Sequence, residues 1–147
     1  NIPHGQVTAA LPSGRKEGKG LADGMSPFGG YDKQGPMAII KSVCSIDHTK
    51  SGCGNLLNMK LSPSLLTSEK DKKSFISLLR AEEELGGYHV QFNVVDTATL
   101  LDAQKHPEDH RDLLVRVAGY SAYFTELRAE AQQAIIDRTE LSYWGTG

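Results

Sequence analysis

Leu114-Val115-Arg116-Val117-Ala118-Gly119-Tyr120-Ser121-Ala122-Tyr123-Phe124 is the stretch on which the interpretation of this 147-residue sequence depends. The mostly apolar run 113–117 predicts a strand that breaks at Gly119. An aromatic-rich turn follows, and apolar residues at helical spacing predict a helix over 125–139. Taken alone, Gly119 indicates only a tight turn, because glycine is the default residue wherever φ must be positive.

The preceding sequence alternates between helix and strand. The first 35 residues are rich in Gly, Pro and Ser and predict loops. Residues 36–46, 68–85 and 97–105 show helical spacing, and Ser68 is suited to cap the second of these helices. Residues 57–61 and 88–94 alternate apolar and polar side chains, which is typical of strands. The tail 141–147 has no clear pattern. Together these segments indicate an α/β fold.

Composition excludes several functions. The net charge is −2, so no strong field attracts nucleic acid or an anionic membrane. No apolar run approaches the length of a membrane span. Only two cysteines are present, Cys44 and Cys53, too few for a disulfide framework. We expect reduced thiols and a cytoplasmic location.

The sequence starts at Asn1 without a methionine and opens directly into the Gly- and Pro-rich segment. Loops of this length usually lie over another surface or carry function. We therefore expect a fragment, a processed chain or one half of a split protein.

Three blocks of the sequence resemble one known family. The first is Leu11-Pro12-Ser13-Gly14-Arg15 with Leu21-Ala22-Asp23-Gly24-Met25-Ser26-Pro27, the second is Gly87-Tyr88-His89-Val90-Gln91-Phe92-Asn93-Val94-Val95, and the third is the stretch around Gly119. In this order they resemble glycyl radical enzymes, the superfamily of pyruvate formate-lyase and its dehydratase, lyase and decarboxylase relatives. The residues before and after the glycine look more like the dehydratase and decarboxylase branch.

The resemblance identifies Gly119 as the glycyl radical residue, with Arg116, Val117, Ala118, Tyr120 and Ser121 as its neighbours in the radical loop. A radical on a backbone α-carbon is delocalised over the flanking amides and needs a nearly planar centre. A Cβ would crowd that centre, and glycine alone has none. Dioxygen destroys such a radical, so we expect a buried tip, with Tyr120, Tyr123 and Phe124 packed around the turn.

The resemblance implies the C-terminal part of an α/β barrel whose glycyl radical hairpin and following helix insert Gly119 toward the centre. We expect residues 1–66 to belong to the barrel body and residues 67–147 to form the glycyl radical domain. The chain itself should bind no metal or cofactor. The radical would be installed by a separate S-adenosylmethionine enzyme with an iron–sulfur cluster, for which the hairpin must swing out, and the complete enzyme would be a homodimer.

In the family the glycyl radical takes hydrogen from a cysteine far upstream, in a Gly-Cys motif. Ser51-Gly52-Cys53-Gly54-Asn55 has the wrong position and lacks the glutamate common in dehydratases, so Cys53 is not assigned as the thiyl residue. We expect Cys53 in a loop before a strand and Cys44 on a helix, facing the core.

Two alternatives remain open at this point. One is an autonomous glycyl radical carrier that repairs an oxygen-cleaved partner enzyme, although the block from Pro12 to Pro27 belongs to the barrel body. The other is a binding module without a radical, which predicts no paramagnetic signal after activation and no cleavage by air.

Overall fold

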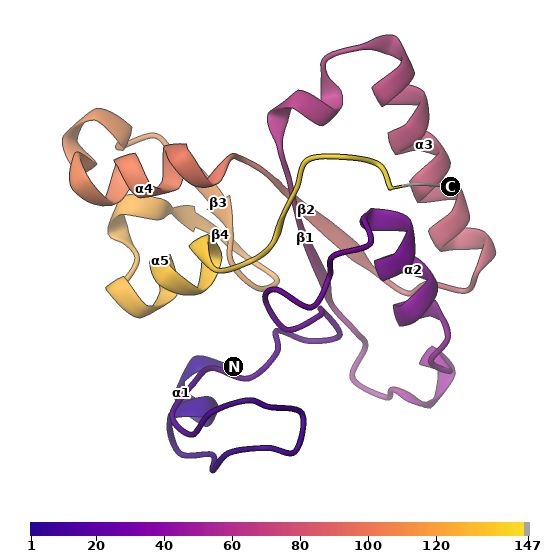
Figure 1. Ribbon diagram of the computed structural model, residues 1–147, viewed down its shortest axis with the longest axis horizontal. Helices are drawn as coiled ribbons and strands as arrows, with labels where there is room; N and C mark the ends of the chain where they lie inside the picture. Colours follow the sequence, from indigo (N-terminus) through magenta and orange to yellow (C-terminus); the bar gives the residue numbers. More distant parts are fainter. Residues whose placement is uncertain (146–147) are drawn as a thin grey trace.

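The computed structural model describes residues 1–145, so the last two residues of the tail lie outside the described part. In chain order the helices and strands are α1 (Ile2–Gln6), α2 (Pro36–Cys44), β1 (Leu57–Leu61), α3 (Glu69–Glu84), β2 (Val90–Val94), α4 (Thr97–Lys105), β3 (Leu114–Arg116), β4 (Ser121–Tyr123), α5 (Ala129–Ile136) and β5 (Glu140–Leu141). Figure 1 shows β1 and β2 in the middle, with α2 and α3 on one side and α4, α5 and the β3–β4 hairpin on the other.

The central sheet is parallel, in the order β2-β1-β5. Leu57 to Leu61 pair in register with Val90 to Val94, and α3 connects the two strands. A parallel pair needs such a crossover, because a tight turn can join only antiparallel strands. The mixed α/β class predicted from the sequence is confirmed. β5, in the tail for which no pattern was seen, pairs with the other edge of β1.

One face of the sheet is apolar and packs on α2 and α3. Its core contains Ile39, Ile40 and Val43 from α2, Leu78 from α3, and Leu57, Met59 and Leu61 from β1. Burying each of these side chains stabilises the fold by about 1.5–3 kcal/mol. The Ser68 cap is confirmed, since Ser68 and Asp71 form both hydrogen bonds of a capping box at the start of α3.

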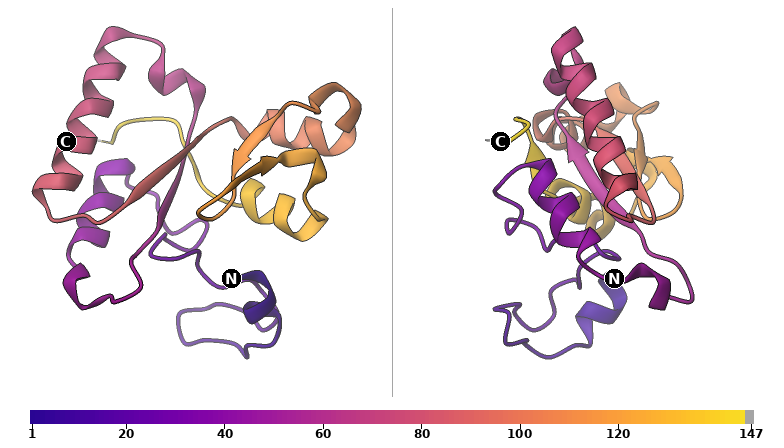
Figure 2. Two further views of the ribbon diagram at one scale, coloured as in Figure 1. Left: turned by 180° about the vertical axis from the view of Figure 1, so that it is seen from behind. Right: turned by 90° about the vertical axis from the view of Figure 1, so that its right-hand side faces the viewer.

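The opposite face of the sheet is polar and also buried. It carries Asn58 and Lys60 from β1 and Gln91 and Asn93 from β2, each less than a tenth exposed. Buried polar groups must find hydrogen-bond partners. Any segment next to this face must therefore offer hydrogen-bonding groups. The β3–β4 hairpin lies beside it and offers them (Figure 2).

A second apolar cluster holds the helices beside the hairpin. It consists of Val95, Leu100, Ala103, Val115, Phe124, Ile135 and Ile136, all buried. Val115 comes from β3 and Phe124 directly follows β4. The base of the hairpin is thus anchored in a hydrophobic core.

The helix predicted over 125–139 is wrong at both ends. Phe124–Glu126 forms a 3-10 turn, Leu127 and Arg128 are extended, and α5 begins only at Ala129. Helical spacing continues through these residues, but burial of Phe124 fixes the chain direction before the helix can start. At the other end, Asp137 caps α5, and Arg138, beyond the helix, donates a hydrogen bond to the hairpin.

The division at residues 66 and 67 stays a prediction. The first apolar cluster takes Leu57 from one side of that boundary and Leu78 from the other. Within residues 1–145, no helix combines the length and hydropathy that crossing a bilayer requires.

Candidate functional site

Gly119 lies at the tip of the β3–β4 hairpin. Leu114, Val115 and Arg116 pair antiparallel with Tyr123, Ala122 and Ser121. The Val117 amide donates to the Tyr120 carbonyl oxygen at 2.9 Å, which leaves Ala118 and Gly119 as the tip. Gly119 has φ +76°, in the left-handed region that residues with a Cβ rarely adopt.

The α-carbon of Gly119 has few neighbours among residues 1–145. A Cβ at this position would have Leu56 Cδ1 as its nearest atom, at 3.9 Å. Leu56 in turn lies directly against Gly24, where a Cβ would overlap the Leu56 carbonyl oxygen. Leu56 thus lies tightly against the loop around Gly24 and is also the nearest side chain to the open space at Gly119.

Polar side chains of β2 hold the hairpin strand that leads to the tip. Asn93 accepts a hydrogen bond from the Arg116 amide and donates one to the Arg116 carbonyl oxygen, both at 2.7 Å. The Arg116 guanidinium donates to Gln91 Oε1 at 2.7 Å and to Ser121 Oγ at 3.3 Å. This pattern fixes the register of the hairpin on the sheet, since only one residue can occupy the position opposite Asn93.

Arg138, just beyond α5, joins the hairpin to the N-terminal loop that carries Asp23. Its guanidinium donates to the carbonyl oxygens of Arg116 at 3.0 Å and Val117 at 2.5 Å, and to the Asp23 carboxylate at 2.7 Å. Both side chains of this ion pair are less than a fifth exposed. Burial lowers the pKa of Arg138, and the charge of Asp23 opposes that shift.

The three sequence blocks meet beneath the hairpin. Asp23 from the first block also accepts from Asn58, which accepts from Gln91 of the second block, which binds Arg116 of the third. The sequence did not predict the contributions of Asn58 and Arg138. The contribution of Asn58 could have been inferred because Asn58 and Lys60 lie on the same face of a predicted strand. No pattern in the sequence indicated the contribution of Arg138.

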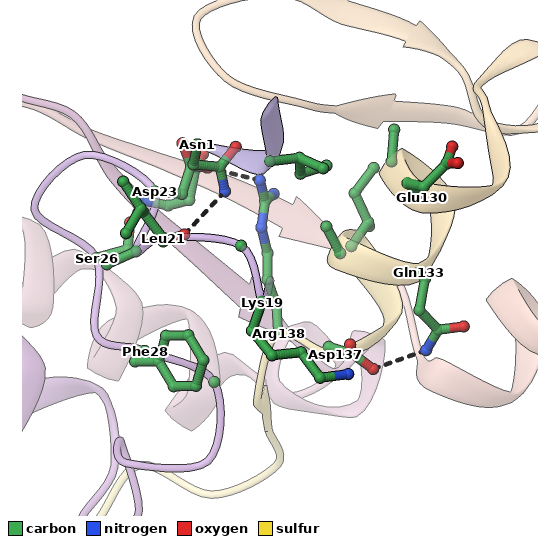
Figure 3. Close-up of a pocket in the computed structure, with 18 of the residues that line it drawn as sticks. Asn1, Lys19, Leu21, Asp23, Ser26, Phe28, Glu130, Gln133, Asp137 and Arg138 are labelled. Atoms are coloured by element: carbon green, nitrogen blue, oxygen red, sulfur yellow. Dashed lines mark hydrogen bonds and ion pairs between the residues drawn. The ribbon is translucent and has the colours of Figure 1, made fainter. Parts of the chain in front are cut away.

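Arg15, in the first block, does not reach the hairpin. Its buried guanidinium donates to the carbonyl oxygens of Thr8 and Ala9 at 2.7 and 2.6 Å and so closes the N-terminal loop. That loop forms one wall of a cleft of about 1030 Å³, and α5 forms the other. Figure 3 shows Asp23 and Arg138 in this cleft, with Glu130, Gln133 and Asp137 from α5 and its C-terminal end opposite the loop. Val117 and Ala118 also line it.

Residues 1–145 alone do not bury the tip, and its burial within a complete barrel stays a prediction. Ala118, Gly119 and Tyr120 are exposed, and Tyr120 and Tyr123 are 55% and 45% exposed rather than packed around the turn. Of the three aromatic residues, Phe124 is the one in the core. The reason is that the hairpin has the polar face of the sheet beneath its first strand, while residues 1–145 leave its outer face open.

Both cysteines are where the sequence predicted them. Cys53 is exposed in the turn before β1, and Cys44 is on α2, against the first apolar cluster. Burial, followed by the charge of Glu82, raises the pKa of Cys44.

A group of side chains with metal-binding chemistry lies elsewhere. In residues 1–145, the side chains that could together hold a metal ion are His106, Glu108 and Asp109, all exposed and just after α4. They form no part of the hydrogen-bonded contacts around Arg116 and Arg138. Exposed acidic groups of this kind are common without any ion, so they are not assigned to the site.

The hairpin and its left-handed glycine lie within the part of the sequence that matches a known family. The model described as Glycine radical matches residues 21–125. This chain belongs to the glycine radical family. The match begins near Asp23 and runs through the whole hairpin, so it includes Gln91 and Asn93, which bind Arg116, while Arg138 lies beyond it. The resemblance drawn from the three sequence blocks is confirmed.

Relatives in the glycine radical family are much longer proteins. The chain is 50% identical over 141 residues to the probable dehydratase YbiW of Escherichia coli (strain K12), covering 95% of this chain and 17% of that protein. It is 48% identical to an indoleacetate decarboxylase of Tractidigestivibacter scatoligenes, covering 94% and 16%. The glycerol-bound, B12-independent glycerol dehydratase of Clostridium butyricum superposes with a TM-score of 0.94 at 47% identity, covering 97% and 18%.

Proposed function

We propose that this chain is the radical-bearing part of a glycyl radical dehydratase, decarboxylase or lyase, and that Gly119 stores the unpaired electron. The observation that supports it best is the left-handed Gly119 at the tip of a hairpin that Asn93 of the second block binds directly and Asp23 of the first block binds through Arg138. The left-handed backbone favours glycine, the residue without a Cβ, and the peptide groups that join Gly119 to Ala118 and Tyr120 can share the spin.

The proposed chemistry is hydrogen-atom transfer at the Gly119 α-carbon. A separate enzyme with S-adenosylmethionine and an iron–sulfur cluster would remove one hydrogen atom from that carbon, with a radical derived from S-adenosylmethionine as the hydrogen acceptor. The glycyl radical then takes the hydrogen atom of a cysteine thiol in the remainder of the enzyme. The S–H bond breaks as the Cα–H bond re-forms, which leaves the unpaired electron on sulfur. The resulting thiyl radical can then attack the substrate.

The remainder of the enzyme also supplies what this chain lacks. The exposed tip would be covered by the barrel that carries the cysteine, which would protect the radical from dioxygen. The names of the relatives favour a small hydroxylated or carboxylated substrate. Free thiols at Cys44 and Cys53 fit a reducing cytoplasm. The complete enzyme would act as a homodimer.

Anaerobic activation tests this proposal. The complete enzyme is incubated with its activating partner, its electron paramagnetic resonance spectrum is recorded, and air is then admitted. We expect a glycyl radical signal, followed by backbone cleavage at Gly119. Gly119→Ala should abolish both and lower the free energy of unfolding by only about 1–2 kcal/mol, the cost of a left-handed alanine.

Gly18→Ala is the matched control. Gly18 has the same φ of +76°, and a Cβ added there would meet no atom within 4 Å, but it lies in the N-terminal loop. This variant should carry the same strain and keep the signal. A radical signal that persists in Gly119→Ala would contradict the proposal.

A further inference from the structure

The hairpin is attached in two chemically different ways. At its base, Val115 and Phe124 are fully buried in the second apolar cluster, and the Phe124 amide donates to the Leu113 carbonyl oxygen at 2.8 Å. Nearer the tip, Arg116 and Val117 are held by polar groups of Asn93, Gln91 and Arg138.

These two attachments differ in how readily they release. Detaching the base would expose apolar surface to water, which is unfavourable in proportion to its area. Detaching the upper part mainly exchanges protein hydrogen bonds for bonds to water, and the net change per bond is small. Val117 also packs against the second apolar cluster there, but it is only partly buried, unlike Val115 and Phe124. The hairpin can therefore pivot about its base while its tip leaves the sheet.

Arg138 is the part of the polar attachment that comes from outside the sheet. It binds the carbonyl oxygens of both Arg116 and Val117 and ties them to a separate segment through Asp23. Hydrogen bonds with an ionised partner are stronger than neutral ones, and both charges here are mostly shielded from water. In Figure 3 Arg138 and Asp23 lie in the cleft that Val117 and Ala118 also line.

We propose that Arg138, oriented by Asp23, is a latch that sets how often the Gly119 tip leaves the sheet. Arg138 is a positioning residue and takes no part in hydrogen transfer. The latch rests on the proposed function for its purpose, which is to balance access of the activating partner to Gly119 against protection of the radical. Its existence can be tested without any radical.

The Arg116 amide reports directly on the latch, because it donates to Asn93 on the sheet and is released when the upper hairpin detaches. Site-resolved hydrogen–deuterium exchange is measured on the complete, unactivated enzyme. Arg138→Gln and Asp23→Asn should each raise the exchange rate of this amide by about tenfold, since each removes a charge-assisted contact. The Ser62 amide, which donates to Leu141 in the sheet, should keep its rate.

Two further variants separate the latch from general destabilisation. Arg138→Lys keeps the charge beside Asp23 but lacks the planar fork that reaches several acceptors at once, so its effect should be intermediate. Arg128→Gln removes an exposed arginine at the other end of α5 and should leave the Arg116 amide unchanged. Equal acceleration of the Arg116 and Ser62 amides, or no acceleration in Arg138→Gln and Asp23→Asn, would overturn the latch.

Radical formation gives the second readout. In Arg138→Gln the initial rate of radical appearance should rise several-fold, and the signal should decay faster in air, because the tip is released more often. Failure of the radical assignment would leave wild type without a signal while the Arg116 amide still responds. Failure of the latch would leave the signal intact and the Arg116 amide unresponsive.

Discussion

At the scale of single residues, Gly119 and Gly24 need glycine for different reasons. Both have positive φ, +76° and +60°. At Gly119 only the backbone angle excludes a side chain, because residues 1–145 leave the space around the α-carbon open. At Gly24 the space is also filled, by the Leu56 carbonyl oxygen. The first position suits the proposed chemistry, and the second is required by close packing.

This difference predicts unequal effects of the same substitution. Gly24→Ala places a methyl group against backbone that cannot move without disturbing the bond from the Met25 amide to Leu56. We expect it to lower the free energy of unfolding by about 3 kcal/mol or more. Gly119→Ala should lower it by only about 1–2 kcal/mol. Urea denaturation of both variants measures this, and equal losses would contradict the geometry at Gly24.

At the scale of elements, Lys60 joins three of them. It belongs to β1, is 1% exposed, and its Nζ donates to Thr97 at the start of α4 at 3.1 Å and to the Ile136 carbonyl at the end of α5 at 2.9 Å. Burial lowers the pKa of Lys60, and the charge of Glu140 partly opposes this. The lysine thus secures two helices at the cost of burying a cation.

The lowered pKa predicts a pH dependence of stability. Between the folded pKa and the ordinary value of 10.5, the unfolded chain holds a proton on Lys60 that the folded chain has released. Stability from this group therefore rises with pH across that window. Lys60→Met should remove that rise, whereas Lys73→Met on the exposed face of α3 should keep it. Denaturation midpoints from about pH 7 to the ordinary lysine pKa measure the difference, and parallel curves for wild type and Lys60→Met would refute it.

At the scale of the whole molecule, residues 1–145 leave the outer face of the hairpin uncovered. Leu114 and Tyr123 face each other across the hairpin and are 59% and 45% exposed. Exposed apolar groups that lie together mark surfaces for contact with other protein. The chain spans about 17% of the length of YbiW, so the proposed enzyme has ample further chain to cover them.

Oxidative footprinting tests whether the rest of the enzyme covers the outer face of the hairpin. Hydroxyl-radical labelling of Tyr120 and Tyr123 should fall several-fold in the complete enzyme relative to this chain alone, because the proposed barrel encloses the tip. Equal labelling in the two samples would mean that the hairpin does not enter the rest of the protein. In Arg138→Gln, part of the protection should be lost.

The alternation and capping patterns were enough to predict most elements. Leu57–Leu61, the Ser68 cap and the strand before Gly119 are confirmed, because each depends on residues close together in the chain. The α5 boundary was missed, since burial of Phe124 overrides local helical spacing.

The sequence by itself determined the family, the α/β class and the glycine at a strand end, because short-range periodicity and three ordered blocks carry that information. Only the tertiary structure decided how the tip is held. Asp23 and Arg138 are 115 residues apart, and no local pattern can show that two such charges meet beside the carbonyls of Arg116 and Val117. Their contact depends on the sheet bringing its polar face, the N-terminal loop and the end of α5 to one point.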